Sequence, residues 1–310
     1  MIKAVIIAVA LAFPAAVHAA APVQICNATW SDPARGDRPV PVRIRMPAGN
    51  GKVPLVLFSH GLDGNLDSGT DWAEAWADAG LAVINIDHPG SDRGVVFNGQ
   101  FLRAMNAEQL AARAGDVKFV LDEVFRRPRE GACDLGRIDR GRIGMSGHSF
   151  GAVTTQAVSG QHYPFGLFPQ FADPRIRASI AFSPSPAAMN DDKDSFGSIR
   201  IPFMSVTGTA DVVPVQRRVS AGDRQRPYRA MPPGGKYLLV LDGANHMQFN
   251  GQDTLRNGMK PDPHVRAVTI AATTAFWRAN LLGDGQAAAW LATPDGLRAM
   301  LAKGDMLEMK

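Results

Sequence analysis

The sequence lacks the patterns that usually identify a metal, phosphate or dinucleotide site. It has no His-Glu-x-x-His pair, no phosphate-binding loop and no dinucleotide fingerprint. The acidic stretch MNDDKDS at 189–195 lacks the glycine and the terminal glutamate of a calcium loop. Charge is not concentrated, because the formal net charge is only +4 and no basic run is interleaved with aromatic residues. We therefore expect no cofactor, no metal and no nucleic-acid partner.

Long hydrophobic runs are also absent, except at the N-terminus. Lys3 precedes an almost wholly apolar stretch at 4–13, and Val17-His18-Ala19 places small residues at the positions expected for cleavage. This layout is typical of a secretory signal peptide, and the apolar stretch is too short to span a bilayer comfortably. We expect residues 1–19 to be removed and residues 20–310 to form one exported domain, periplasmic or secreted. An uncleaved N-terminal anchor is the alternative.

Cysteine is scarce, with only Cys26 and Cys133 in the whole chain. An even pair in an exported protein indicates one disulfide, and two separately buried thiols are the alternative. Neither cysteine has a candidate base beside it in the sequence, so neither is expected to be catalytic.

Short apolar runs alternate with helical patterns along the rest of the chain. Strands that are nearly unbroken apolar runs are typical of a sheet covered on both faces, and strands alternating with helices indicate a mostly parallel, doubly wound α/β sheet. The prolines of 38–46 favour an edge position for that strand. Strands are expected at 38–46, 53–59, 82–87, 142–146, 177–182, 201–207 and 236–241, and helices at 71–79, 107–127, 149–159 and 265–282. The loops at 161–174, 184–198 and 222–235 are expected to be irregular and too short for an independent lid.

The stretch RIGMSGHSFGAV at 142–153 places Ser149 between two glycines, directly after a strand and before a helix. This context predicts a nucleophile at the apex of a tight turn, where Gly147 and Gly151 leave room for the helix to pack back on the strand. The helix N-terminus there favours a developing negative charge.

A serine nucleophile needs a base and an acid that orients the base. His246 follows the strand at 236–241 and is the predicted base. For His88, His162 and His264, the sequence shows no combination of a preceding strand and a nearby candidate acid. Asp211 follows the preceding strand and is the predicted acid, with Asp242 as the alternative.

The oxyanion produced by serine attack needs two backbone N–H donors. The amide of Phe150, directly after the nucleophile, is the first candidate. The second is the amide of Leu62 in FSHGLDG at 58–64, where His-Gly as an ordinary turn is the alternative. Trp72 and Phe249 are candidates for lining the substrate pocket, although core packing explains their spacing as well.

Four segments, SHGLDG, GHSFG, GTADVVP and GANHMQF, resemble the landmarks of α/β-hydrolase-fold serine esterases. The closest resemblance is to bacterial proteins similar to dienelactone hydrolase and to platelet-activating factor acetylhydrolase. DPARGDRPVPVRIRMP, DHPGSD and AFWRANLLGDGQAAAWL extend this resemblance over nearly all the mature chain. It implies an α/β-hydrolase fold, a Ser149–Asp211–His246 triad and an oxyanion hole from the amides of Leu62 and Phe150. Dienelactone hydrolases carry a cysteine nucleophile, so the serine here favours a general ester substrate.

The sequence thus predicts a hydrolase of small carboxylic esters, first of all a short-chain carboxylesterase. A lipase or polyester hydrolase is the second expectation, because the absence of an obvious lid leaves the site open to bulky substrates. An acyltransferase would use the same triad, and a catalytically silent binding protein would use the same fold.

Overall fold

A single nine-stranded sheet forms the centre of the computed structural model, which describes residues 22–95, 104–164, 170–189, 191–213, 219–252 and 260–310. The predicted signal peptide at 1–19 lies outside the described residues. The strand order is β1-β2-β4-β3-β5-β6-β7-β8-β9, with parallel pairing from β4 through β8 and antiparallel pairing at both margins. The predicted mostly parallel sheet is therefore confirmed. The strands are β1 Gln24–Asp32, β2 Arg38–Met46, β3 Val53–Ser59, β4 Ala82–Ile86, β5 Ile138–His148, β6 Ile176–Phe182, β7 Phe203–Ala210, β8 Lys236–Asn245 and β9 Met306–Met309.

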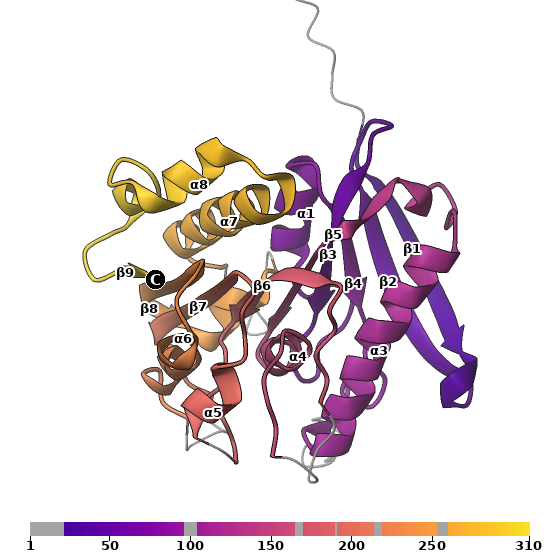
Figure 1. The fold of residues 1–310 in the computed structure, drawn as a ribbon, viewed down its shortest axis with the longest axis horizontal. Coiled ribbons are helices and arrows are strands. Elements are labelled where there is room, and N and C mark those ends of the chain that lie inside the picture. The colour runs from indigo at the N-terminus through magenta and orange to yellow at the C-terminus, as the bar shows by residue number, and fades with distance from the viewer. Residues whose placement is uncertain (1–21, 96–103, 165–169, 190, 214–218, 253–259) are drawn as a thin grey trace, which may run out of the picture.

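Helices cover both faces of this sheet, which explains why its central strands are apolar on both sides. In β3, Val56 and Phe58 pack with the core on one face, whereas Leu55 and Leu57 pack with the core on the other. Figure 1 shows α1, α7 and α8 on one side and α3 and α4 on the other. The helices are α1 Thr70–Asp78, α3 Ala107–Arg126, α4 Phe150–Val158, α5 Asp192–Phe196, α6 Arg226–Ala230, α7 Pro263–Trp277 and α8 Gly285–Ala292.

The edge position predicted for 38–46 is wrong. β2 lies inside the sheet, between β1 and β4, and the unpredicted strand β1 forms the margin. The prolines are tolerated because β2 pairs with β4 only through Val42–Arg45, so Pro41 lies beyond that ladder. Pro41 contributes only its carbonyl there, which accepts a hydrogen bond from Asp87 N at 2.9 Å.

The two loops predicted to be irregular at 184–198 and 222–235 contain the short helices α5 and α6. Segments 96–103 and 165–169 lie outside the described residues, so the expectation of little or no lid stays a prediction. In the described part of the chain, no helix is both long and apolar enough to cross a bilayer.

A disulfide joins Cys26 on β1 to Cys133, in the segment between α3 and β5, with an S–S distance of 2.06 Å. This confirms the pairing expected from the cysteine count. The bond ties the marginal strand β1 to the connection that leads into β5, the strand that precedes Ser149.

Candidate active site

Ser149 occupies the turn between β5 and α4, and its backbone adopts φ 56° and ψ −114°. A non-glycine residue in this region is strained and persists only where the surroundings hold it. The Ser149 amide donates to the carbonyl of Phe182 on β6 at 3.0 Å, and the Ser149 carbonyl accepts from Val153 N at 3.1 Å. The turn is therefore held by the neighbouring strand and by the first turn of α4.

Gly147 and Gly151 have the steric role that the sequence predicts. A Cβ on Gly147 would lie 2.4 Å from the carbonyl oxygen of Gly151, and a Cβ on Gly151 would lie 1.9 Å from the carbonyl oxygen of Ser59. Both contacts involve backbone atoms that cannot move aside without displacing a strand or helix. The close approach of α4 to β3 and β5 therefore requires glycine at both positions.

His246 follows β8 directly and begins a short 3-10 turn, with its imidazole between Ser149 and Asp211. Its Nε2 lies 2.9 Å from Ser149 Oγ, and its Nδ1 lies 2.7 Å from Asp211 Oδ1. With Nδ1 carrying the proton and donating to Asp211, Nε2 is free to accept a proton from the serine hydroxyl. The three predicted residues thus form one continuous hydrogen-bonded chain.

Asp211 is fully buried at the end of β7. Burial alone would raise the pKa of its carboxyl, but the hydrogen bond from His246 and the nearby guanidinium of Arg224 bring the pKa below its ordinary value. Thr207 Oγ1 donates to Asp211 Oδ2 at 2.7 Å, and Arg224 Nε lies 3.4 Å from Oδ1. The carboxylate therefore stays ionised and fixed in orientation. The sequence pattern did not reveal Arg224, because it lies in a segment without periodicity.

Asp242, the alternative acid, is exposed and faces a different partner. Its Oδ1 accepts from Thr209 Oγ1 at 2.8 Å, and its backbone N–H donates to Asp305 Oδ1. The structure therefore places Asp242 within the last part of β8 and brings Asp211, rather than Asp242, to His246.

The amides of Leu62 and Phe150 lie on the two segments that flank Ser149. Phe150 is the first residue of α4, so its N–H has no partner within the helix. A Cβ on Gly61, next to Leu62, would lie 3.3 Å from Ser149 Cβ, which shows how close the 58–64 loop comes to Ser149. Among the described residues, neither amide donates a hydrogen bond to another group. Both are available for an oxyanion.

His148 contacts the backbone of His246, the predicted base. Its Nε2 donates to the carbonyl of His246 at 2.9 Å, and the two imidazoles lie 4.6 Å apart between centroids. Burial, followed by repulsion from His246, lowers the pKa of His148 well below its ordinary value. His148 is therefore neutral, and it holds His246 in place from the position before Ser149.

His88 and His264 each contact an aspartate, although the sequence analysis found no acid partner for either. His88 Nδ1 lies 3.0 Å from Asp116 Oδ2, and His264 Nε2 lies 2.7 Å from Asp305 Oδ2. The acids are 28 and 41 residues away along the chain, so no local sequence pattern predicted these pairs. Among the described residues, His246 is the histidine in contact with Ser149.

The pocket role predicted for Trp72 and Phe249 requires correction. Trp72 is 1% exposed and Phe249 is 0% exposed, and both belong to the core beneath α1 and α7. Trp72 stacks on Phe182 with centroids 5.6 Å apart, and its Nε1 donates to the Phe249 carbonyl at 3.2 Å. These contacts satisfy the indole and leave neither side chain facing a substrate.

No protein-family model matches the sequence, and no curated protein matches it. Among solved structures, the chain is similar to a ferulic acid esterase from Streptomyces cinnamoneus, with a TM-score of 0.62 and 19% sequence identity. The match covers 88% of this chain and 93% of the esterase chain. The chain has an α/β-hydrolase fold. The narrower resemblance to dienelactone hydrolase and platelet-activating factor acetylhydrolase stays an expectation.

In an α/β-hydrolase fold, the nucleophile, acid and base follow one another in this order along the chain. Ser149 follows β5, Asp211 follows β7 and His246 follows β8, so the chain has this order. In the described part of the chain, no group of three or more His, Cys, Asp or Glu side chains is placed to hold a metal ion.

Proposed function

We propose that the protein is an exported serine hydrolase that cleaves carboxylic esters, with small short-chain esters as its first substrates. The observation that carries this proposal is the continuous contact from Ser149 Oγ through His246 to Asp211, at 2.9 Å and 2.7 Å. The fold similarity to a ferulic acid esterase supports the same reaction class. The disulfide and the apolar N-terminal segment support export to an oxidising compartment.

The proposed reaction begins with attack of Ser149 Oγ on the ester carbonyl, while His246 Nε2 accepts the hydroxyl proton. The amides of Leu62 and Phe150 stabilise the oxyanion of the tetrahedral intermediate. His246 then gives the proton to the leaving alcohol, and an acyl-enzyme remains on Ser149. Water, deprotonated by His246, attacks the acyl carbon and releases the carboxylic acid, which restores the serine. Asp211 keeps the imidazole in the required tautomer and stabilises the imidazolium in both halves.

The decisive experiment compares the mature wild-type protein with Ser149→Ala. We expect wild-type turnover of p-nitrophenyl acetate or butyrate, with labelling of Ser149 by a fluorophosphonate probe. Ser149→Ala should lose essentially all turnover and labelling while keeping the wild-type melting temperature. Unchanged turnover in the variant, or a wild-type protein that the probe does not label, would show that the assignment is wrong.

Substrate preference is tested with p-nitrophenyl esters of increasing acyl length, together with a feruloyl ester because the similar structure is a ferulic acid esterase. We expect kcat/KM to be highest for the shortest acyl groups. A maximum at long chains would favour the lipase or polyester hydrolase alternative. Product analysis with an added alcohol acceptor separates hydrolysis from acyl transfer, because a transferase would form the new ester faster than the free acid.

A further inference from the structure

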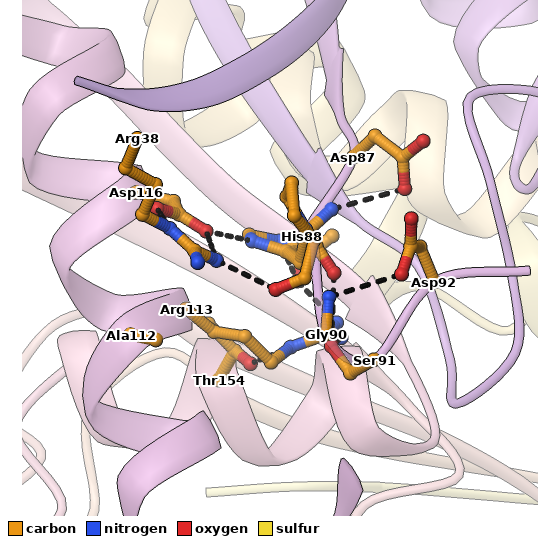
Figure 2. A network of polar contacts seen from close by, with 12 residues as sticks. Arg38, Asp87, His88, Gly90, Ser91, Asp92, Ala112, Arg113, Asp116 and Thr154 are labelled. Atoms are coloured by element: carbon orange, nitrogen blue, oxygen red, sulfur yellow. Dashed lines mark hydrogen bonds and ion pairs between the residues drawn. The ribbon is translucent and has the colours of Figure 1, made fainter. Parts of the chain in front are cut away.

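Arg113 lies fully buried between the two segments that carry the proposed oxyanion donors. It projects from α3, a helix that contributes none of the predicted catalytic residues. Its hydrogen bonds divide among three partners: the 58–64 loop, the 87–95 loop and helix α4. Figure 2 shows its side chain beside Thr154 and Ser91.

Toward the 58–64 loop, Arg113 Nη2 donates to two groups. One is Ser59 Oγ at 3.0 Å, and the other is the carbonyl oxygen of His60. The His60 carbonyl belongs to the peptide that leads into Gly61, and Leu62 follows. A charged donor on this carbonyl fixes the peptide plane, and so the direction in which the following amides point.

Toward α4, Arg113 Nε donates to Thr154 Oγ1 at 3.0 Å. Thr154 is one helical turn beyond Phe150 and donates to the Phe150 carbonyl at 3.1 Å. The guanidinium also lies over the Phe150 ring, 4.6 Å from its centroid. Arg113 therefore holds Phe150, the helix residue whose amide is one of the two proposed oxyanion donors.

Toward the 87–95 loop, Arg113 Nη1 donates to Ser91 Oγ at 2.8 Å. This loop contains the DHPGSD motif and contacts the 58–64 loop directly. Asp63 N donates to the Ser91 carbonyl at 2.9 Å, and Gly94 N donates to Asp63 Oδ1 at 2.5 Å. The motif thus has a structural role, because it holds the residue after Leu62.

A second Ser–His–Asp chain lies behind these contacts. Ser59 Oγ is 2.9 Å from His88 Nε2, and His88 Nδ1 is 3.0 Å from Asp116 Oδ2, which Arg38 also contacts at 3.0 Å. Figure 2 shows His88 between Asp116 and Arg113. All three members of the chain are fully buried, and Ser59 Oγ already accepts a hydrogen bond from Arg113. The chain therefore has no access to substrate and instead fixes the orientation of Ser59 beside the guanidinium.

The protonation of this chain follows from burial. Burial lowers the pKa of His88 to about 3, so the imidazole is neutral and donates from Nδ1 to Asp116. Its Nε2 then accepts from the Ser59 hydroxyl. Burial also lowers the pKa of Arg113 to about 9, with Asp116 and Asp87 opposing the shift, so the guanidinium is charged at neutral pH.

We infer that Arg113 is a positioning residue that sets the separation and direction of the two oxyanion donors, the amides of Leu62 and Phe150. The inference rests on the proposed hydrolase function. A guanidinium suits this role because its planar array of five N–H groups can reach three segments at fixed angles, which an ammonium cannot. Donors in an oxyanion hole act only when placed at hydrogen-bond distance from the developing charge, so loosening one segment lowers kcat more than it raises KM.

The test is a matched pair of substitutions on α4, Thr154→Val and Thr155→Val. Both threonines are fully buried, and each donates to the carbonyl four residues earlier, but Thr154 alone of the two accepts from Arg113. We expect Thr154→Val to lower kcat about tenfold on a p-nitrophenyl ester, with KM within about twofold. Thr155→Val should keep kcat within about twofold of the wild-type value. Equal losses in the two variants would overturn the inference.

Substitution of Arg113 itself is expected to lower kcat more than Thr154→Val does. Arg113→Lys keeps the charge and should lower kcat about a hundredfold, comparable to the loss of one oxyanion donor. Arg45→Lys is the control for removing another buried guanidinium, because Arg45 contacts Asn85 at 2.9 Å and its side-chain partners among the described residues lie outside the 58–64 loop. Inhibition by a boronic acid, whose tetrahedral adduct on Ser149 mimics the intermediate, should weaken in parallel with kcat. Wild-type boronate affinity in Arg113→Lys, or an equal loss in Arg45→Lys at the same melting temperature, would contradict the role.

These outcomes are distinct from failure of the proposed function. If the wild-type protein hydrolyses no ester and Ser149 is not labelled, the hydrolase assignment fails. The proposed role of Arg113 in positioning the oxyanion donors then fails with it. If the wild-type protein is active and labelled while Thr154→Val behaves like Thr155→Val, the hydrolase assignment stands and the role of Arg113 is refuted.

Discussion

The two aspartates considered as the acid, Asp211 and Asp242, differ in burial and in the partners of their side chains. Asp211 is buried and contacts His246, whereas Asp242 is exposed and contacts Thr209. We expect Asp211→Asn to lower kcat about 10³–10⁴-fold, because an amide cannot hold the donor tautomer of His246. Steady-state kinetics on a p-nitrophenyl ester checks this. Asp242→Asn is the matched control and should change kcat less than about threefold, and a larger loss in this control would reverse the assignment of the acid.

Buried neutral histidines make the stability of the fold dependent on pH. Burial lowers the pKa of His88 from 6.5 to about 3, so below pH 6.5 the unfolded chain binds a proton that the folded chain does not. The free energy of unfolding should therefore fall as the pH drops from 6.5 toward 3. Each such histidine contributes about 1.4 kcal/mol per pH unit within this window. Urea denaturation at pH 7, 6 and 5 measures the slope.

His88→Gln removes this contribution and should give a shallower decline of stability with acidification. His162→Gln, at an exposed position, is the control and should keep the wild-type slope. A slope that does not change in His88→Gln would show that His88 is not neutral in the folded protein.

At the scale of helices and strands, the sequence predicts the elements around the active site better than the margins of the sheet. The Ser149 turn, the central strands and the long helix α3 followed from glycine spacing and apolar periodicity, because the local pattern and the packing agree there. β1 and β9 were not predicted, since marginal strands are half exposed and their apolar pattern is interrupted by polar residues. The partners of Arg113 and His88 were also not predictable, because they come from segments up to 54 residues away along the chain.

Gly151 provides the sharpest test at this scale. Gly151→Ala would place a Cβ 1.9 Å from the Ser59 carbonyl, so α4 must move away from β3. We expect the variant to be insoluble or to melt well below the wild-type temperature, as measured by circular dichroism. Gly285→Ala, at the start of α8, is the control because its Cβ would meet nothing within 4 Å. A Gly151→Ala protein as stable as Gly285→Ala would contradict the close packing of α4.

The disulfide acts at the scale of the whole molecule. It closes a loop of 107 residues, for which the chain-entropy model gives about 4–5 kcal/mol of stabilisation. The double variant Cys26→Ser/Cys133→Ser should therefore unfold at clearly lower urea concentration. Its kcat at 25 °C should stay close to the wild-type value, because neither cysteine contacts the proposed triad. Equal urea midpoints for the two proteins would show that the bond does not stabilise the fold.

The disulfide loop contains some of the proposed site residues and leaves the others outside. The stretch between Cys26 and Cys133 contains Leu62 and Arg113, whereas Ser149, Asp211 and His246 all lie beyond it. A protease that cuts the exposed turn at 48–52 would therefore separate the polypeptide into two pieces that remain bonded to each other. The disulfide would therefore allow the protein to tolerate a single nick at this turn, since the piece that carries β1 and β2 cannot diffuse away from the piece that carries Leu62, Arg113 and Ser149.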